Sequence, residues 1–129
     1  TGLENLISVG GDLWIKDNAA LTSLTGPDNL TAVGGTLNIG NPALTSLTGL
    51  ENLTSVGGFL SIIDNPALTS LTGLDNLTTV GWDLNIWSND ALCQSVVDAF
   101  AARFPGNLVN DYFCFYYYGY YCSYNDVSC

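Results

Sequence analysis

The chain has 129 residues and a mass of 13.7 kDa, the size of one domain, and its 12 acidic and two basic residues give a net charge of −10. This balance excludes nucleic acids and anionic membrane surfaces as partners, because both need clustered Lys or Arg. The chain contains no histidine, the commonest general base and metal ligand, and no apolar run approaches the length of about 18 residues that a spanning helix needs, so we expect no enzyme, no cofactor and no membrane insertion.

A repeat fills the first 92 residues. Four similar segments span 1–24, 25–47, 48–71 and 72–92, with periods of 24, 23 and 24 residues. A unit of this length cannot bury its own apolar face, so each segment predicts one coil of a solenoid. Stacking the coils aligns six apolar columns, which we expect to form the core: Leu3, Pro27, Leu50 and Leu74; Leu6, Leu30, Leu53 and Leu77; Val9, Val33, Val56 and Val80; Leu13, Leu37, Leu60 and Leu84; Ile15, Ile39, Ile62 and Ile86; Leu21, Leu44, Leu68 and Leu92.

Within each coil, an L-x-I segment alternates apolar and outward positions and predicts a strand of a parallel sheet, at 13–15, 37–39, 60–62 and 84–86. Gly pairs at 10–11, 34–35 and 57–58 are expected to turn the corner before the strand with positive φ. An Asn recurs after each strand. We interpret this column as a structural ladder of amides that bind turn backbone, with a ligand-binding row as the alternative: Asn18, Asn41, Asn65 and Asn89.

The pattern L-x-I-x-x-N-x-x-L resembles leucine-rich repeats, and the longer G-L-x-N-L-x-x-V-G-G-x-L-x-I resembles the variant in receptor L domains and secreted bacterial leucine-rich proteins. The resemblance covers residues 1 to about 104. It implies a mainly β fold, a right-handed L-domain-like solenoid of about four coils with a parallel sheet. To this fold the residues after Leu92 add a predicted C-terminal capping helix and a disulfide-bonded aromatic tail. The resemblance also implies a non-enzymatic recognition or surface element, and it carries over no catalytic residue.

The period breaks after Leu92. Val96 or Val97, Phe100 and Phe104 fall at helical spacing, so an amphipathic helix at about 93–104 is expected to cover the last coil, with Arg103 suiting the helix dipole and Pro105-Gly106 ending the helix. We therefore divide the chain into a repeat solenoid at 1–104 and a Tyr-rich tail at 105–129.

The tail is dominated by aromatic residues. Nine of the thirteen residues from Tyr112 to Tyr124 are Tyr or Phe, and we do not expect this segment to form a fifth coil. A three-residue loop at 117–119 would make a hairpin with position 114 opposite position 122.

The four cysteines all lie after residue 92, and their spacing without histidine favours two disulfides over a zinc site. The hairpin allows Cys114–Cys122 together with Cys93–Cys129. The resemblance to capped bacterial repeats implies instead Cys93–Cys114 and Cys122–Cys129, which is the pairing we adopt. Disulfides indicate an oxidising compartment, so we expect a secreted, extracellular or cell-surface protein.

Three surface features are candidate sites. Outward strand positions form an alternative ligand face for a protein or glycan, which comprises Trp14, Asn38, Phe59, Ser61, Ile63, Asn85 and Trp87. One carboxylate per coil forms a row that is either solvated or neutralised by a cation such as Ca²⁺: Glu4, Asp28, Glu51 and Asp75. Three N-glycosylation motifs begin at Asn29, Asn52 and Asn76, and the repetition itself explains them.

The first coil enters directly in repeat phase, so its apolar residues have no coil in front of them in this sequence, and we expect something to cover them. The leading hypothesis is a structural protein that assembles with copies of itself, head to tail, into a filament or surface polymer. Its predicted interface joins the first coil to the Tyr-rich end and comprises Leu3, Leu6, Val9, Leu13, Ile15, Tyr112, Tyr116, Tyr117, Tyr118, Tyr120 and Tyr121.

Overall fold

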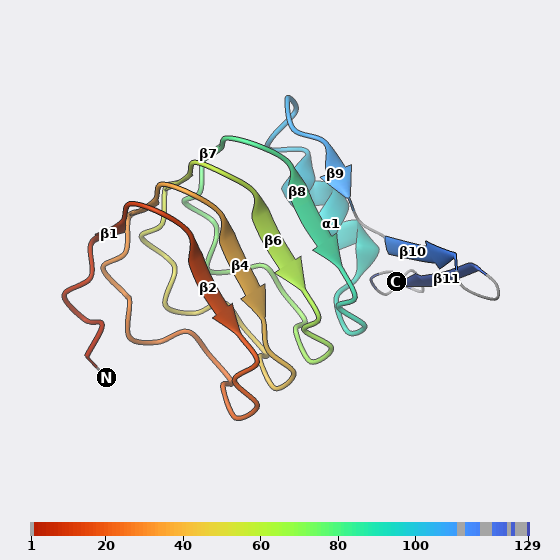
Figure 1. The fold of residues 1–129 in the computed structure, drawn as a ribbon, viewed down its shortest axis with the longest axis horizontal. Helices are drawn as coiled ribbons and strands as arrows, with labels where there is room; N and C mark the ends of the chain where they lie inside the picture. Colours follow the sequence, from red (N-terminus) through yellow and green to blue (C-terminus); the bar gives the residue numbers. More distant parts are fainter. Residues whose placement is uncertain (1, 111–112, 117–119, 124, 126–128) are drawn as a thin grey trace.

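The structure is a computed structural model that describes residues 2–110, 113–116, 120–123, 125 and 129, with only the backbone described for 113–116 and 120–123. It confirms a mainly β, parallel solenoid of about four coils (Figure 1). One side of the coils carries a five-stranded sheet in the order β2 (Leu13–Lys16), β4 (Leu37–Gly40), β6 (Leu60–Ile63), β8 (Leu84–Trp87) and β9 (Val109–Asn110).

The register of this sheet confirms the repeat alignment. Leu13 pairs with Leu37, Leu37 with Leu60 and Leu60 with Leu84, all in parallel strands. A second sheet was not predicted. It forms at the corner before the main strand of each coil, from four two-residue strands: β1 (Ser8–Val9), β3 (Ala32–Val33), β5 (Ser55–Val56) and β7 (Thr79–Val80).

The predicted apolar columns form the core in coils 2 to 4, where all of their leucines and isoleucines are buried. A seventh column was missed, that of the buried Leu24, Leu47 and Leu71. In coil 1 the same columns are only half-buried or exposed, since among the described residues no coil packs on their outer side. The stack therefore has one apolar end within the described chain.

The Gly pairs at the corners do not adopt positive φ, so that expectation was wrong. The structure gives a different reason for glycine there. A Cβ added at Gly57 would lie 2.2 Å from the carbonyl oxygen of Gly34 in the preceding coil, and one at Gly81 would lie 2.1 Å from that of Gly57. Glycine is needed because neighbouring coils approach through their backbones at this corner.

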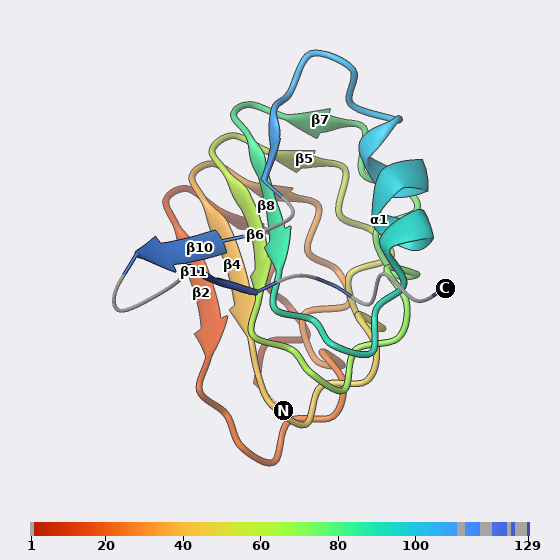
Figure 2. The same cartoon turned by 90° about the vertical axis from the view of Figure 1, so that its right-hand side faces the viewer.

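The predicted cap helix is confirmed as α1 (Gln94–Ala101), and Figure 2 shows it on the side of the coil opposite the five-stranded sheet. Val97, Phe100 and Phe104 are buried against coil 4. The helix ends at Ala101, before Pro105, and Arg103 acts differently from the expectation. Its guanidinium group donates to backbone carbonyl oxygens of coil 4, at 2.9 Å from Asp75 and 2.6 Å from Leu77.

The C-terminal tail overturns two predictions. The disulfide joins Cys93 to Cys129, so the adopted pairing of Cys93 with Cys114 and of Cys122 with Cys129 was wrong. The error came from the family resemblance, whereas the hairpin geometry had allowed the observed bond. The tail was also not expected to form a fifth coil, but it adds a fifth strand to the sheet, because β9 pairs in parallel with β8. The predicted hairpin itself is present: β10 (Phe113–Tyr116) and β11 (Tyr120–Ser123) are antiparallel, with positions 114 and 122 opposite one another.

Candidate functional site

The outer side of coil 1 is apolar and hollowed. A recess of about 240 Å³ is lined mainly by leucine, isoleucine and proline side chains and by Trp14. Leu3 is 52 % exposed and Trp14 67 %. Isolated exposed apolar residues are normal on proteins, but a contiguous apolar recess of this kind is a candidate interaction site. We call this surface the coil-1 face; it comprises Leu3, Leu6, Leu13, Trp14 and Ile15.

The coil-1 face contains four of the five solenoid residues predicted for the self-assembly interface, and the fifth, Val9, is half-buried beside it. Trp14 of this face was predicted instead for the alternative ligand face. Of the predicted tail residues, Tyr112, Tyr117 and Tyr118 lie outside the described residues. The other three belong to the hairpin, in whose strands only the backbone is described: Tyr116, Tyr120 and Tyr121.

The hydrogen-bond pattern of coil 1 is that of an interrupted ladder. In the described part of the chain, Asn18 receives no backbone N–H at its side-chain oxygen, whereas Asn41 and Asn65 each receive one from the preceding coil, at 3.0 and 2.8 Å. Strand β2 is likewise an edge of its sheet. Coil 1 therefore presents both apolar surface and unused backbone pairing positions.

The other edge of the sheet, β9, is also partly apolar. Leu108 is 70 % exposed and Val109 36 %, and the second residue of the strand, Asn110, is exposed too. The hairpin of β10 and β11 projects from this end of the solenoid (Figure 1). The two edges of one parallel sheet thus carry exposed apolar side chains at opposite ends of the stack.

The alternative ligand face is ordered by hydrogen bonds along the outward row of the sheet. Asn110 donates to the side-chain oxygen of Asn85 at 2.8 Å, and Asn85 donates to Ser61 Oγ at 3.3 Å. The row then breaks, because the buried Oδ1 of Asn38 has no hydrogen-bond partner among the described residues. An orphaned acceptor is costly unless a ligand or water satisfies it.

The aromatic residues of this face do not form one platform. Phe59 packs edge to face against Trp82, with ring centroids 4.9 Å apart, at the corner before the strands. Ile63 lies opposite Trp87 in the register of β6 and β8, near the other end of the sheet. Only Trp14 of the predicted face is strongly exposed, while Ser61 is buried.

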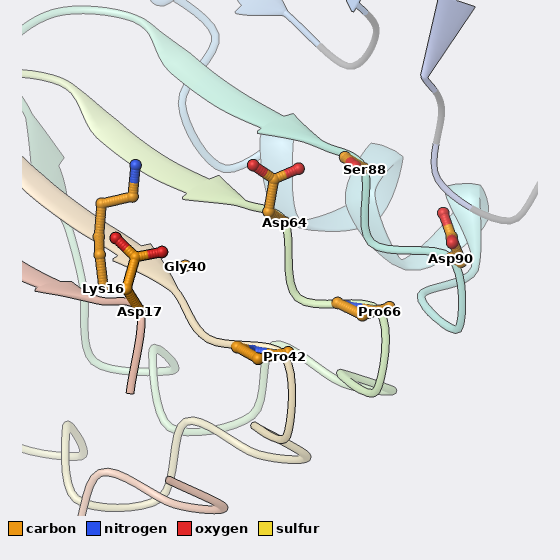
Figure 3. Close-up of a pocket in the computed structure, with 8 residues that line it drawn as sticks. All are labelled: Lys16, Asp17, Gly40, Pro42, Asp64, Pro66, Ser88 and Asp90. Carbon is orange, nitrogen blue, oxygen red and sulfur yellow. The ribbon is translucent and has the colours of Figure 1, made fainter. Parts of the chain in front are cut away.

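A groove of about 400 Å³ lies where the strands end and was not predicted (Figure 3). Lys16 and Asp17 of coil 1, Asp64 of coil 3 and Ser88 of coil 4 contribute to its lining. Asp17, Asp64 and Ser88 adopt φ values of 58 to 60°, and coil 2 has no counterpart. The signal was in the sequence, since the second coil is one residue shorter and lacks a residue between Gly40 and Asn41.

Carboxylates of the row that has one per coil have a structural role, because they accept hydrogen bonds from the backbone of their own coil. Glu51 accepts the backbone N–H of Gly49 at 2.8 Å, and Glu4 accepts that of Gly2 at 2.7 Å. Hydrogen bonds from the backbone N–H groups of Glu4 itself and of Gly2 lower the pKa of the Glu4 carboxyl. The described residues contain no group of three or more metal-ligating side chains placed to hold an ion.

The three N-glycosylation motifs occupy a structural column. The amide nitrogen atoms of Asn29, Asn52 and Asn76 each donate to a carbonyl oxygen of the preceding coil, at 2.6 to 2.7 Å. These bonds account for the repetition of the motif. Within the described residues, no helix is both long and apolar enough to cross a membrane.

Comparison with known proteins adds no relative. No protein-family model, no curated protein and no solved structure matches the chain.

Proposed function

We propose that this chain is a non-catalytic, extracellular structural protein that assembles with copies of itself, head to tail, through its coil-1 face. The observation that carries the proposal is the apolar recess of coil 1, combined with the unpaired edge of β2. The repeat pattern further supports assignment of the solenoid to the L-domain-like leucine-rich type. The Cys93–Cys129 disulfide supports an oxidising, extracellular location.

The opposite end of the stack supplies the complementary surface. All five strands of the sheet run parallel, with β2 and β9 at its two edges. A second copy displaced along the stack therefore brings its β2 alongside the β9 of the first in the same parallel orientation. Exposed Leu108 and Val109 then face the apolar recess of the next copy. Such a heterologous contact repeats without closure and yields a filament.

The direct test is sedimentation velocity across a concentration series, with electron microscopy of the most concentrated samples. Leu3→Asp combined with Trp14→Asp places two charges in the contact at positions that are exposed in the single chain, so the fold should survive while association falls at least about tenfold. Thr69→Asp, at an exposed position in the middle of the stack, is the control for added negative charge. A monomer at every concentration, or association that the double variant leaves unchanged, would contradict the proposal.

A second candidate is recognition of a hydroxyl-rich ligand such as a glycan on the strand face. It is favoured by the exposed ring of Trp14, which can pack on a sugar face, next to Asn38. The Oδ1 of Asn38 is buried without a partner among the described residues, and a shift of this side chain would bring the acceptor to a ligand hydroxyl. Titration of soluble oligosaccharides, followed by tryptophan fluorescence, tests this candidate. A response that survives in both Trp14→Ala and Asn38→Ala would refute it.

A further inference from the structure

Each coil of the repeat donates hydrogen bonds to carbonyl groups of the coil before it, in fixed columns. The amide of the ladder Asn donates to the strand Ile, as Asn65 Nδ2 does to the oxygen of Ile39 at 3.1 Å. At the corner, a Gly N–H donates to a Val, as Gly57 does to Val33 at 2.8 Å. Coil 4 needs equivalent donors from outside the repeat.

Side chains of the C-terminal segment supply these donors. Asn125 is 4 % exposed, and its Nδ2 donates to the oxygen of Ile86 at 2.8 Å, in the column of the ladder Asn. Asn107 donates from its amide to the oxygen of Val80 at 2.8 Å, in the column of the corner Gly. With β9 paired to β8, these groups reproduce the contacts of a fifth coil.

The spacing along the chain shows where this fifth coil departs from the others. The ladder Asn follows the Ile to which it donates by 26 or 27 residues in coils 2 to 4, but Asn125 follows Ile86 by 39 residues. The fifth coil therefore has 12 or 13 residues more than the repeat requires. Most of the excess lies between β9 and Asn125, where Asn110 and Asn125 enclose the hairpin of β10 and β11. The hairpin is an insertion within a coil.

This hairpin stands apart from the solenoid. Its two strands pair with each other and with neither of the solenoid sheets (Figures 1 and 2). An isolated two-stranded hairpin is only marginally stable in water, so packing against a surface would stabilise it. The insertion from 112 to 124 carries no charged residue, although the whole chain has a net charge of −10.

From these observations we infer that the hairpin is an interaction arm inserted in a fifth coil, and that its partner is a second copy of this chain. The inference rests on the proposed self-assembly and names the element that extends the contact. Because the arm carries no charge, it avoids the repulsion that an acidic segment would meet on another strongly acidic copy, whereas a basic partner would be recognised by the acidic surface elsewhere. The arm also lies at the same end of the stack as the exposed β9 edge, so one copy can present both surfaces to the coil-1 face of the next.

Replacing residues 111–124 by Ile-Trp-Ser, the residues that join Asn85 to Asn89, tests the insertion directly. We expect this variant to unfold cooperatively with a Tm within about 5 °C of that of the full chain, because Asn125 and the Cys93–Cys129 disulfide are retained. Its dissociation constant for self-association should rise at least about tenfold. A variant that folds and associates as the full chain does would overturn the role of the arm, and one that fails to fold would overturn its description as an insertion.

A milder pair of variants keeps the test independent of folding. Tyr116 and Tyr120 are backbone partners across the hairpin, so Tyr116→Ser with Tyr120→Ser removes aromatic area from the arm, whereas the double Phe variant retains it. Weaker association in the Ser variant alone is expected, and equal association in both would contradict the inference. Dissociation by Leu3→Asp with Trp14→Asp, but not by either arm variant, would refute the arm and leave the proposed function standing. A monomeric full chain would refute both.

Discussion

The ladder asparagines show how one residue type can hold neighbouring coils together. Asn65 is fully buried; its Oδ1 accepts the backbone N–H of Asn41 at 2.8 Å, and its Nδ2 donates to Asn89 Oδ1 at 3.0 Å. Asn65→Ala removes these bonds and leaves buried polar groups unsatisfied, so we expect a loss of about 3 kcal/mol in the free energy of unfolding measured with urea. Asn52→Ala is the control. This exposed side chain makes one hydrogen bond among the described residues, so its loss should lower the free energy of unfolding by about 1 kcal/mol or less. Equal costs for the two variants would show that burial of the ladder does not matter.

The corner glycines offer a matched pair within one column. A Cβ at Gly57 would lie 2.2 Å from a backbone oxygen, whereas one at Gly10 would meet nothing within 4 Å. We therefore expect Gly57→Ala to lower the free energy of unfolding by about 2 to 3 kcal/mol and Gly10→Ala to leave it nearly unchanged. Comparable losses in the free energy of unfolding for both variants, measured with urea, would mean that the backbone freedom of glycine explains why it recurs at this corner. The close approach between coils would then not be the reason.

Single residues also show what a repeat in sequence can and cannot predict. Four copies of the repeat in one chain identify which positions are equivalent, so the core columns and the Asn ladder could be predicted from periodicity. The physical reason for a repeated residue is harder to infer. The corner glycines were expected to need positive φ, but their role depends on the distance between coils, which no single coil determines.

At the scale of elements, α1 and the segment after it seal coil 4. Arg103 donates to the carbonyl oxygens of Leu74, Asp75 and Leu77, and its guanidinium carbon lies 5.2 Å from the centre of the Phe100 ring. A lysine keeps the charge but lacks the planar fork that reaches several acceptors at once. We expect Arg103→Lys to lower the free energy of unfolding by about 1 to 2 kcal/mol. Urea unfolding that matches the unchanged chain would show that the positive charge alone is sufficient.

The pairing of β10 with β11 predicts a second disulfide. Their register places Cys114 and Cys122 opposite one another, while Cys93 and Cys129 are already joined. Directly opposite positions of an antiparallel pair bring their Cβ atoms within the range that a disulfide needs. We expect mass spectrometry of a non-reduced peptic digest to find Cys114–Cys122 and Cys93–Cys129 peptides. A peptide joining Cys93 to Cys114 would contradict both bonds.

The C-terminal elements were the least predictable part of the fold. The apolar spacing of α1 was readable because the helix buries one face. The fifth coil was not, because its contacts come from two side-chain amides and leave no apolar pattern. Asn107 replaces the backbone donor of the corner Gly, and Asn125 takes the place of the ladder Asn at a different spacing. The inserted hairpin also lengthened the spacing between Asn125 and the preceding coil, so Asn125 did not fall at the period of the repeat.

For the whole molecule, the proposed assembly depends on the surface that the stack leaves uncovered among the described residues. The apolar end of coil 1 could be predicted because periodicity shows which of its side chains would pack on a neighbouring coil. The groove at the strand ends was not predicted, although the shorter second coil marked its place. A one-residue difference in length changes the shape of the surface only when the coils are stacked.

Net charge provides the final prediction for the proposed assembly. Each copy carries −10, so the proposed association through an apolar contact would work against repulsion between whole molecules. The screening length falls from about 30 Å at 0.01 M salt to about 10 Å at 0.1 M. We therefore expect self-association, measured by sedimentation velocity, to strengthen about tenfold between 0.01 and 0.3 M sodium chloride. Thr69→Asp should increase this dependence slightly, because it adds charge without touching the contact. Association that weakens with salt would instead indicate a contact between opposite charges, such as Lys16 with a carboxylate of the next copy.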